Sequence, residues 1–482
     1  MRVLVVGGGI TGLAAAYELG RAGIPTTLLE ATARIGGKIA TERHDGYLVE
    51  TGPDSFVSYR PAAAELAREL GLGADLVGPQ EPRTVHVRVA GRFARLPDGL
   101  GLVLPTRLGP FVTTDLFSMP QKLRAGLDLV LPRGRETGDQ AVGAFLERRL
   151  GRGLVDRLAG PLIGGVYGTP IDELSLDAVV PQLREAERRH RSLLLASLAD
   201  GRARRRSGRA PTPPFITLRA GLGSLVEALV GALERLPTVE IVTGVAADSL
   251  DTRPGGVTLR TRVNGSPVRR FEGLAAVLAT PAPVAAALLE PLLPEASRHL
   301  RSIPHGTSAI VSLGYDPGDV PLGIESHGFL VAAGESLAVT ACTLSSRKWV
   351  GRAPEGALLA RAFMRPDHAG AASDADLAAM AQRDLATLLG LRRPPRLVHV
   401  VRHRAAMPHY TVGHLDRIAA IEAATQAVPQ LALAGGAYRG VGLPDCIGQG
   451  RTAAQRISEL LSGVPVGAGA DRGRPVPAAP AS

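Results

Sequence analysis

The first residues with recognisable chemistry are closely spaced glycines near the N-terminus. An apolar run at residues 3–6 is followed by a glycine-rich turn and then by an alanine-rich segment typical of a helix. In such a unit the first glycine makes the tight turn, the second admits a pyrophosphate, and the third lets helix and strand pack closely. The helix N-terminus adds free N–H groups and partial positive charge. The spacing predicts a dinucleotide site formed by Gly7, Gly8, Gly9, Ile10, Thr11 and Gly12.

An acidic residue follows at the distance that this kind of site requires. Residues 26–29 predict a second strand that leads into Glu30, 18 residues beyond Gly12. A carboxylate in this position can accept a hydrogen bond from a ribose hydroxyl. We therefore assign Glu30 and its neighbour Ala31 to the same cofactor site.

A second glycine pair follows the first motif in order. Gly36-Gly37 lies within Arg34–Lys38, and a strand at 47–50 leads into residues 51–55. The spacing Glu-x3-Arg-x-Gly-Gly-Lys resembles the extended signature of amine-oxidase-like FAD flavoproteins. The resemblance implies that this pair carries the chain beneath FAD and that the later strand reaches the flavin; an ordinary glycine-rich turn is the alternative. The implied FAD contacts are Gly37, Lys38, Gly52, Pro53, Asp54 and Ser55.

The C-terminal region contains another glycine-rich loop, Gly440–Ile447, between a strand and a helix. Backbone N–H groups of such a loop can meet the edge of a flavin that becomes negative on reduction. The run Gly-Val-Gly-Leu-Pro-Asp-Cys-Ile closely resembles the C-terminal motif of protoporphyrinogen and coproporphyrinogen oxidases. The resemblance assigns Val441, Gly442 and Leu443 to the flavin, and Ala247, where the family usually has Val, to a main-chain contact on the adenine side.

The resemblance covers nearly the whole chain and is closest to the soluble Gram-positive branch, whose members act chiefly on coproporphyrinogen III. It implies a six-electron oxidation of a porphyrinogen, in which FAD accepts two electrons three times and O2 reoxidises it to hydrogen peroxide. The flavin supplies the chemistry and the protein supplies placement. No Ser-His-Asp set, HExxH or paired-carboxylate motif appears. We therefore assign no catalytic side chain and no metal.

Five residues are candidates for substrate contact. Tyr167 is flanked by glycines and is expected in the cavity, with a core tyrosine as the alternative. Four propionates require cationic partners, and arginine suits carboxylates. The cationic candidates are Arg60, Arg191, Lys348 and Arg439, for each of which a solvated surface charge is the alternative. Asp54 stands where the membrane-bound eukaryotic branch has an arginine, which weakens a protoporphyrinogen interpretation.

The length, composition and charge of the chain limit the class of protein it can be. The 482 residues should form two or three domains, and 45% hydrophobic with 21% charged residues is typical of a globular protein. The net charge of +10 fits an acidic ligand or an anionic membrane face, or an ordinary basic surface. No nucleic-acid motif appears. The chain has only two cysteines, its first apolar run is short, and it has no uncharged apolar stretch of 18 residues. These features predict a cytoplasmic protein without a signal peptide or transmembrane segment. Peripheral contact with a membrane is compatible with this composition.

The order of motifs predicts an α/β fold: a discontinuous Rossmann-like FAD-binding domain, a mixed-sheet substrate domain and an inserted helical domain. The helical domain should contain a helix at 153–160, and the mixed sheet should contain strands at 328–331 and 358–364. Arg202–Arg206 and three following prolines predict a flexible loop, with nucleic-acid contact as a minor alternative. The predicted boundaries are FAD-binding domain 1–75, 215–281 and 403–462; substrate domain 76–100 and 282–402; helical domain 101–200; flexible loop 201–214; and disordered tail 463–482.

The sequence thus predicts an FAD-dependent coproporphyrinogen III oxidase that uses O2, with transient contact with a ferrochelatase. One alternative is a protoporphyrinogen IX oxidase with the same mechanism. Another is an amine oxidase or carotenoid desaturase, although this chain has only 4% aromatic residues from which to build an amine-binding cage. A third is a non-catalytic flavoprotein or porphyrin carrier.

Overall fold

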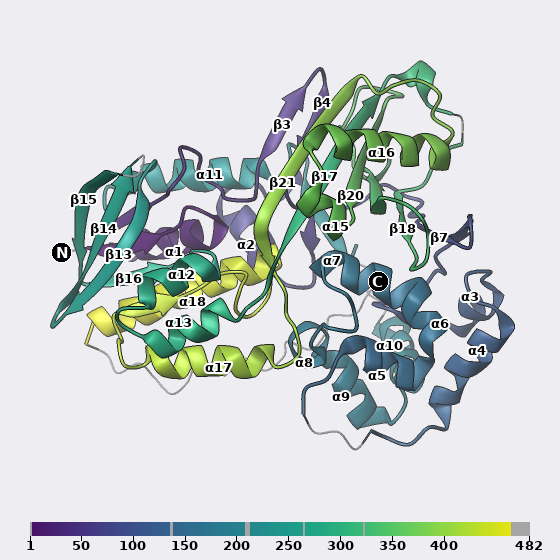
Figure 1. Ribbon diagram of the computed structural model, residues 1–482, viewed down its shortest axis with the longest axis horizontal. Helices are drawn as coiled ribbons and strands as arrows, with labels where there is room; N and C mark the ends of the chain where they lie inside the picture. Colours follow the sequence, from purple (N-terminus) through teal and green to yellow (C-terminus); the bar gives the residue numbers. More distant parts are fainter. Residues whose placement is uncertain (1, 135–137, 208–212, 264–265, 322, 464–482) are drawn as a thin grey trace.

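The computed structural model describes residues 2–134, 138–207, 213–263, 266–321 and 323–463. The predicted tail therefore lies outside the described residues, apart from Gly463. Figure 1 shows three parts: a sheet layered between helices and a small second sheet near the N-terminus, a large mixed sheet, and a cluster of helices below it.

The first part is built on a five-stranded parallel sheet. Its strand order is β12-β2-β1-β16-β22, so strands from three separated parts of the chain lie side by side. Strands β1, β2 and β16 are buried along their whole length, as expected for a parallel sheet covered on both faces. The strands are β1 (Val3–Val6), β2 (Thr26–Leu29), β12 (Val239–Val242), β16 (Ala275–Leu278) and β22 (Leu431–Leu433).

Different elements cover the two faces of this sheet. One face packs against α1 (Ile10–Arg21), α2 (Ala62–Glu69), α11 (Gly223–Glu234) and α18 (Leu443–Leu461). The other face packs against a three-stranded antiparallel sheet and three helices: β13 (Ala246–Arg253), β14 (Gly256–Val263), β15 (Ser266–Gly273), α12 (Ala282–Leu289), α13 (Pro294–Arg301) and α17 (His414–Thr425). This arrangement confirms the predicted Rossmann-like α/β class.

The second part is a seven-stranded mixed sheet with the order β21-β17-β20-β19-β18-β7-β8, in which only the pair β18–β7 is parallel. Its apolar face packs against α15 (Pro366–Ala371) and α16 (Asp374–Leu389). Strands β18 and β20 have the predicted bounds, and β21 runs through position 402, the proposed boundary between the substrate and FAD-binding domains. The strands are β7 (His86–Val89), β8 (Arg92–Arg95), β17 (His305–Tyr315), β18 (Gly328–Val331), β19 (Val339–Leu344), β20 (Leu358–Met364) and β21 (Leu397–Pro408).

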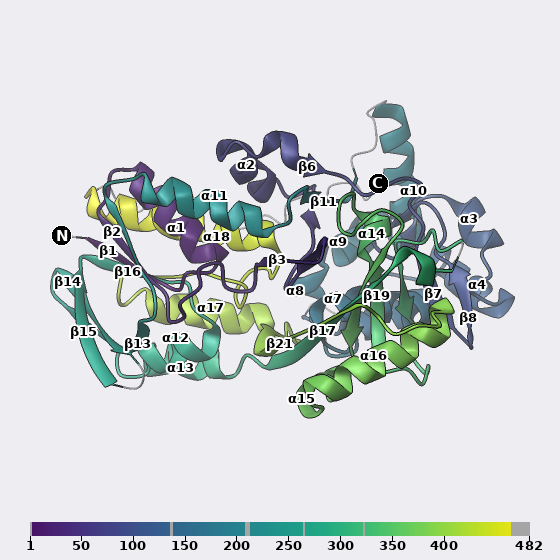
Figure 2. The same ribbon diagram turned by 90° about the horizontal axis from the view of Figure 1, so that it is seen from above.

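Short elements connect the two sheets. The hairpin of β3 (Thr41–His44) and β4 (Tyr47–Glu50) lies alongside β21, between the two parts of the molecule in the second view (Figure 2). Strand β11 pairs with β5 and with β6. The remaining short elements outside the helical part are β5 (Phe56–Val57), η1 (Gly73–Asp75), β6 (Leu76–Val77), β11 (Phe215–Leu218), η4 (Pro317–Asp319) and α14 (Ser345–Lys348).

The third part is helical and surrounds its own apolar cluster. The helix predicted at 153–160 begins in α6 and continues as a π-helix, η3, that contains Pro161. Because proline has no N–H to donate, it is incompatible with regular α-helical bonding at this point. The elements are β9 (Leu100–Gly101), β10 (Leu104–Pro105), α3 (Leu108–Thr113), α4 (Met119–Gly126), η2 (Leu127–Leu129), α5 (Val142–Leu150), α6 (Arg152–Leu154), η3 (Val155–Gly164), α7 (Gly165–Tyr167), α8 (Leu176–Val179), α9 (Pro181–His190) and α10 (Leu193–Ser207).

The arginine-rich segment differs from the expected flexible loop. Helix α10 extends to Ser207 and includes Arg202–Arg206. Arginine has a high helix propensity, so a run of arginines can continue a helix whose apolar start is anchored in the core. Leu193 and Leu194 provide that anchor. Residues 208–212 of the predicted loop lie outside the described residues.

A buried ion pair ties the helical part together. Asp128 and Arg149 are both 0% exposed and form an ion pair. The carboxylate of Asp128 also accepts hydrogen bonds from the Ser192 hydroxyl at 2.6 Å and the Leu194 N–H at 2.9 Å. Arg149 further donates to the carbonyl oxygen of Arg191 at 2.7 Å. These bonds join η2, α5 and the start of α10.

Removing Asp128 should therefore destabilise the protein strongly. We expect Asp128→Ala to lower the free energy of unfolding by about 3–5 kcal/mol, because buried Arg149 would lose its nearer counter-ion and keep only Glu187, at 3.4 Å. Asp115→Ala is the matched control, since Asp115 pairs with Arg92 on the surface, where a pair contributes at most about 1 kcal/mol. Urea unfolding followed by circular dichroism measures both. Equal transition midpoints for the two variants would contradict a structural role for the buried pair.

Candidate functional site

The turn after β1 is formed by backbone contacts that exclude side chains. Gly7 has φ +108°, and a Cβ on Gly12 would lie 1.9 Å from the carbonyl oxygen of Gly7. Gly7 therefore requires glycine for its backbone conformation, and Gly12 requires it for close packing. At Gly9, by contrast, a Cβ would meet no atom within 4 Å. The backbone at Gly9 thus faces open space at the N-terminus of α1, where phosphates can approach.

Glu30 lies beside this turn. One oxygen of its carboxylate accepts the N–H of Gly8 at 2.8 Å, and the other accepts the N–H and the hydroxyl of Thr32, both at 2.8 Å. These bonds hold the carboxylate at the carboxyl end of β2, next to the glycine turn. Ala31 follows it in an exposed position.

The second glycine pair lies directly against the first turn. The N–H of Gly36 donates to the carbonyl oxygen of Gly8 at 2.8 Å, and a Cβ on Gly37 would lie 3.1 Å from the Cα of Gly9. The segment that follows β4 also packs closely against this region, since a Cβ on Gly52 would lie 2.0 Å from the carbonyl oxygen of Lys38. The predicted glycines of both motifs are therefore brought together at the same end of the sheet.

The glycines of the two motifs form a cradle, and its position in the sheet fits a dinucleotide. Strand β1 pairs in parallel with β2 on one side and with β16 on the other, so the order of strands reverses between β1 and β16. Open α/β sheets bind ligands at the carboxyl ends of strands at such a point. Gly435, at the end of β22 on the same edge, also has no atom within 4 Å of a Cβ. The residues present thus fit an extended dinucleotide cofactor.

The C-terminal glycine loop is fixed by a tyrosine that the sequence did not single out. The hydroxyl of Tyr410 donates to the carbonyl oxygen of Gly436 at 2.8 Å and accepts the N–H of Gly440 at 2.7 Å. The Tyr410 ring also stacks on His414 with centroids 3.9 Å apart. Gly442 then caps α18, which begins at Leu443. The loop that contains Val441 is therefore held at both ends.

Next to this loop the structure gathers Arg60, Tyr167 and Asp445. Arg60 forms an ion pair with Asp445 of the glycine loop. Burial raises the pKa of the Tyr167 hydroxyl to about 12, an effect that the charge of Arg60 opposes. Tyr167 lies with its ring centroid 6.0 Å from that of Tyr410. Two of the five candidate substrate residues thus belong to one cluster beside the proposed flavin loop.

Asp54 anchors a second cluster. Its carboxylate accepts the indole N–H of Trp349 at 3.1 Å and lies 3.3 Å from the Lys348 ammonium and 3.7 Å from the Arg361 guanidinium. Burial alone would raise the pKa of Asp54, but the charges of Lys348 and Arg361 and the hydrogen bonds hold it well below its usual range. Asp54 is therefore ionised, and the charge of Lys348 is already balanced by it.

The other predicted residues are dispersed. Arg191 ends α9 in a left-handed conformation and donates to the carbonyl oxygen of Leu129 at 2.9 Å, within the helical part. Arg439 is bound in a fork by Glu422 of α17, at 2.8 and 2.6 Å. Ala247 lies on β13 beside the apolar cluster on the far face of the parallel sheet. Lys38 donates to the carbonyl oxygen of Ala406.

Sequence reasoning missed three residues of these clusters: Asp445, Arg361 and Tyr410. A signal existed for Arg361, because it interrupts an otherwise apolar run, residues 358–364, that reads as a buried strand. A charge inside such a strand needs a partner, since an unpaired buried charge is very costly. Asp445 lies within the C-terminal motif itself, but its ion pair with Arg60 joins segments far apart in the sequence.

No helix among the described residues is long and apolar enough to span a bilayer. Several exposed apolar side chains lie on or next to short helices of the helical part: Leu108, Val112, Met119, Leu123, Leu127, Leu129 and Val130.

Comparison with known proteins gives matches over almost the whole chain. A coproporphyrinogen III oxidase of Propionibacterium freudenreichii subsp. freudenreichii is 43% identical, covering 94% of this chain and 90% of the relative. Human protoporphyrinogen oxidase is 32% identical, covering 94% and 98%.

A solved structure also matches. A proposed protoporphyrinogen oxidase from Exiguobacterium sp. 255-15 superposes with a TM-score of 0.81 at 34% identity, covering 95% of this chain and 98% of that one. The family model described as flavin-containing amine oxidoreductase matches residues 10–458. With its glycine cradle at the carboxyl edge of a parallel sheet, this chain belongs to the family of flavin-containing amine oxidoreductases.

Proposed function

We propose that this flavoprotein is an FAD-dependent coproporphyrinogen III oxidase of haem biosynthesis, acting with O2. The observation that carries the proposal is the 43% identity, over 94% of the chain, to a protein named coproporphyrinogen III oxidase. FAD, when bound, accepts two electrons in each of three rounds, so that three O2 become three H2O2 while the porphyrinogen loses six electrons and six protons. The protein binds and orients both molecules and excludes water.

The residues that hold FAD are proposed from the family resemblance and, near α1, also from the geometry of the glycine cradle. The pyrophosphate lies against Gly7, Gly8, Gly9, Ile10, Thr11 and Gly12, where free N–H groups of α1 stabilise its charge. Glu30 and Ala31 face the ribose, and the backbone of Ala247 faces the adenine. The flavin is held by Gly37, Lys38, Gly52, Pro53, Asp54, Ser55, Val441, Gly442 and Leu443.

The substrate residues are proposed from the sequence, and the positions of two of them support the proposal. Arg60 and Tyr167 have the strongest support, because both lie beside the glycine loop that bears Val441 and Gly442. Lys348 forms an ion pair with Asp54, which is one of the proposed flavin residues, and would offer its remaining N–H donors to a propionate. Arg191 and Arg439 complete the proposed set, each at present bonded to protein oxygens.

The setting is proposed as the cytoplasm, with product passed to a ferrochelatase by transient contact. Both cysteines are free and buried, as suits a reducing compartment. Peripheral contact with a membrane is also proposed. It is supported by the exposed apolar side chains on α3 and α4, such as Val112, Met119 and Leu123.

The function is tested by running coproporphyrinogen III and protoporphyrinogen IX side by side on FAD-loaded protein in air. We expect faster porphyrin fluorescence from the tetracarboxylate, with three peroxides released per porphyrin. Preference for the dicarboxylate would favour the protoporphyrinogen IX alternative. If both rates equal that of autoxidation without protein, the protein is not an oxidase of either substrate, and a carrier function gains support.

A second test concerns Glu30. We expect Glu30→Ala to weaken FAD binding by about 10–100-fold, because a charged hydrogen bond contributes about 1.5–3 kcal/mol. The matched control is Glu240→Ala, on the neighbouring strand β12, where the carboxylate pairs with Arg2 on the surface. Flavin fluorescence titration of the apoprotein measures both dissociation constants. Unchanged FAD affinity in Glu30→Ala would remove Glu30 from the site.

A third test concerns Arg60. We expect Arg60→Ala to raise KM for coproporphyrinogen III by about 10–100-fold, through loss of a charged contact with a propionate. The turnover number should change less, since the flavin supplies the chemistry. Arg301→Ala is the control, because Arg301 of α13 pairs with Glu290 on the surface. An unchanged KM at full FAD occupancy would show that Arg60 serves only to fix Asp445.

A further inference from the structure

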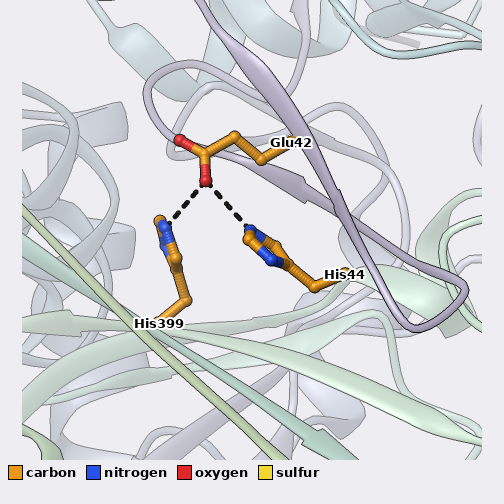
Figure 3. A group of neighbouring side chains, drawn as sticks. All are labelled: Glu42, His44 and His399. Carbon is orange, nitrogen blue, oxygen red and sulfur yellow. Dashed lines mark hydrogen bonds and ion pairs between the residues drawn. The ribbon is translucent and has the colours of Figure 1, made fainter.

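Three side chains with metal-binding chemistry gather outside the cofactor site: Glu42, His44 and His399 (Figure 3). Nε2 of His44 lies 2.9 Å from Oε2 of Glu42, and Nε2 of His399 lies 3.0 Å from the same oxygen. All three ligand atoms lie within 4.8 Å of one another. The cluster joins the β3–β4 hairpin to strand β21, from a distant part of the chain.

We propose that Glu42, His44 and His399 form a Zn²⁺ site. Two imidazoles and one carboxylate are a ligand set typical of zinc, with bonds of about 2.0–2.2 Å. Ligand atoms at a tetrahedral ion with such bonds lie roughly 3.3 Å apart. The two separations of 2.9 and 3.0 Å are close to this value. Small side-chain rotations would therefore admit the ion, with water as the fourth ligand.

The backbone, rather than chance side-chain rotation, brings these groups together. Glu42 and His44 are two residues apart on β3, so their side chains leave the same face of the strand. Tyr47 pairs with His44 across the hairpin and is buried in a small apolar cluster. Leu397 of β21 packs against this cluster. His399 lies two residues beyond Leu397 and so shares its face of the strand. The packed pair thus sets the position of the ligands.

The surroundings allow an ion to enter. The side chains of Glu42, His44 and His399 are 43%, 38% and 22% exposed, which leaves room for the ion and its water. Arg396 is a neighbouring cation, but it lies 3.8 Å from Asp45 and 3.5 Å from Asp316, so its charge is offset. Nδ1 of His399 has no hydrogen-bond partner, so no contact behind the ring fixes its tautomer. Its Nε2 can therefore serve as a donor to Glu42 or as a metal ligand.

A bound ion would tie the hairpin to the large sheet. A hydrogen bond already joins them nearby, between the imidazole Nε2 of His403 and the carbonyl oxygen of Thr51, at 2.9 Å. Because the three ligands meet only in the folded protein, Zn²⁺ should stabilise the native state in proportion to its occupancy. The site itself does not depend on the proposed enzymatic function.

The site is tested on the full, untagged, FAD-loaded protein after treatment with EDTA and desalting. We expect calorimetric titration with ZnCl2 at pH 7.5 to show one ion per chain, and MgCl2 to show none, because imidazole suits zinc and not magnesium. Saturating Zn²⁺ should raise the Tm by a few degrees, and EDTA should reverse the shift. Absence of Zn²⁺ binding would overturn the proposal.

Variants locate the binding. His44→Ala and His399→Ala should each weaken Zn²⁺ binding by more than about tenfold, since even changes behind the ligands cost about 10–100-fold. Both should abolish the Tm shift. His190→Ala is the matched control, because His190 is exposed on α9, and it should bind Zn²⁺ as the unaltered chain does. His44→Ala lies in a partly exposed position, so it tests the site even if His399→Ala fails to fold. Undiminished Zn²⁺ binding in His44→Ala would place the ion elsewhere and overturn the proposal.

Discussion

Contact between backbones without intervening side chains is the constraint on which the rest of the molecule depends. A Cβ on Gly12 would overlap the carbonyl oxygen of Gly7, and one on Gly450 would lie 2.3 Å from the carbonyl oxygen of Thr11. Helix α18 can therefore approach α1 this closely only because it has no side chain at Gly450. Gly52 brings the end of the hairpin equally close to the preceding chain. Cofactor cradle and helix packing thus share one requirement, the absence of Cβ atoms.

Buried charges impose a second constraint where the hairpin meets the large sheet. Arg352 and Arg361 are each 1% exposed, and they lie 3.7 Å from Glu50 and Asp54 respectively. A buried charge without its partner is costly, so the two parts of the molecule are stable in the one arrangement that pairs them. Arg361 also donates to the carbonyl oxygen of Gly52 at 2.6 Å. The large sheet therefore helps to position the segment that is proposed to reach the flavin.

The sequence predicted what depends on local spacing and failed where distant segments meet. The glycine turn, Glu30 and the strands β18 and β20 follow from short-range patterns, because each is a property of neighbouring residues. The charge of Lys348 is visible in the sequence, but its pairing with Asp54 is not, since only the tertiary fold brings those segments together. The same holds for the cluster of Glu42 and His399. Helix α10 was mispredicted because Arg202–Arg206 has a helix propensity that its charge and the nearby prolines obscured.

The pairing of β1 with β16 has a consequence for synthesis of the chain. Val3 to Val6 pair with Ala275 to Leu278, contacts of very high sequence separation. At a ribosomal rate of about 5–20 residues per second, the apolar edge of β1 waits roughly 14–54 s for that partner. During this interval the first nucleotide-binding unit exposes a strand edge able to pair with other nascent chains. A chaperone bound along this edge would shield it until residues 275–278 are synthesised.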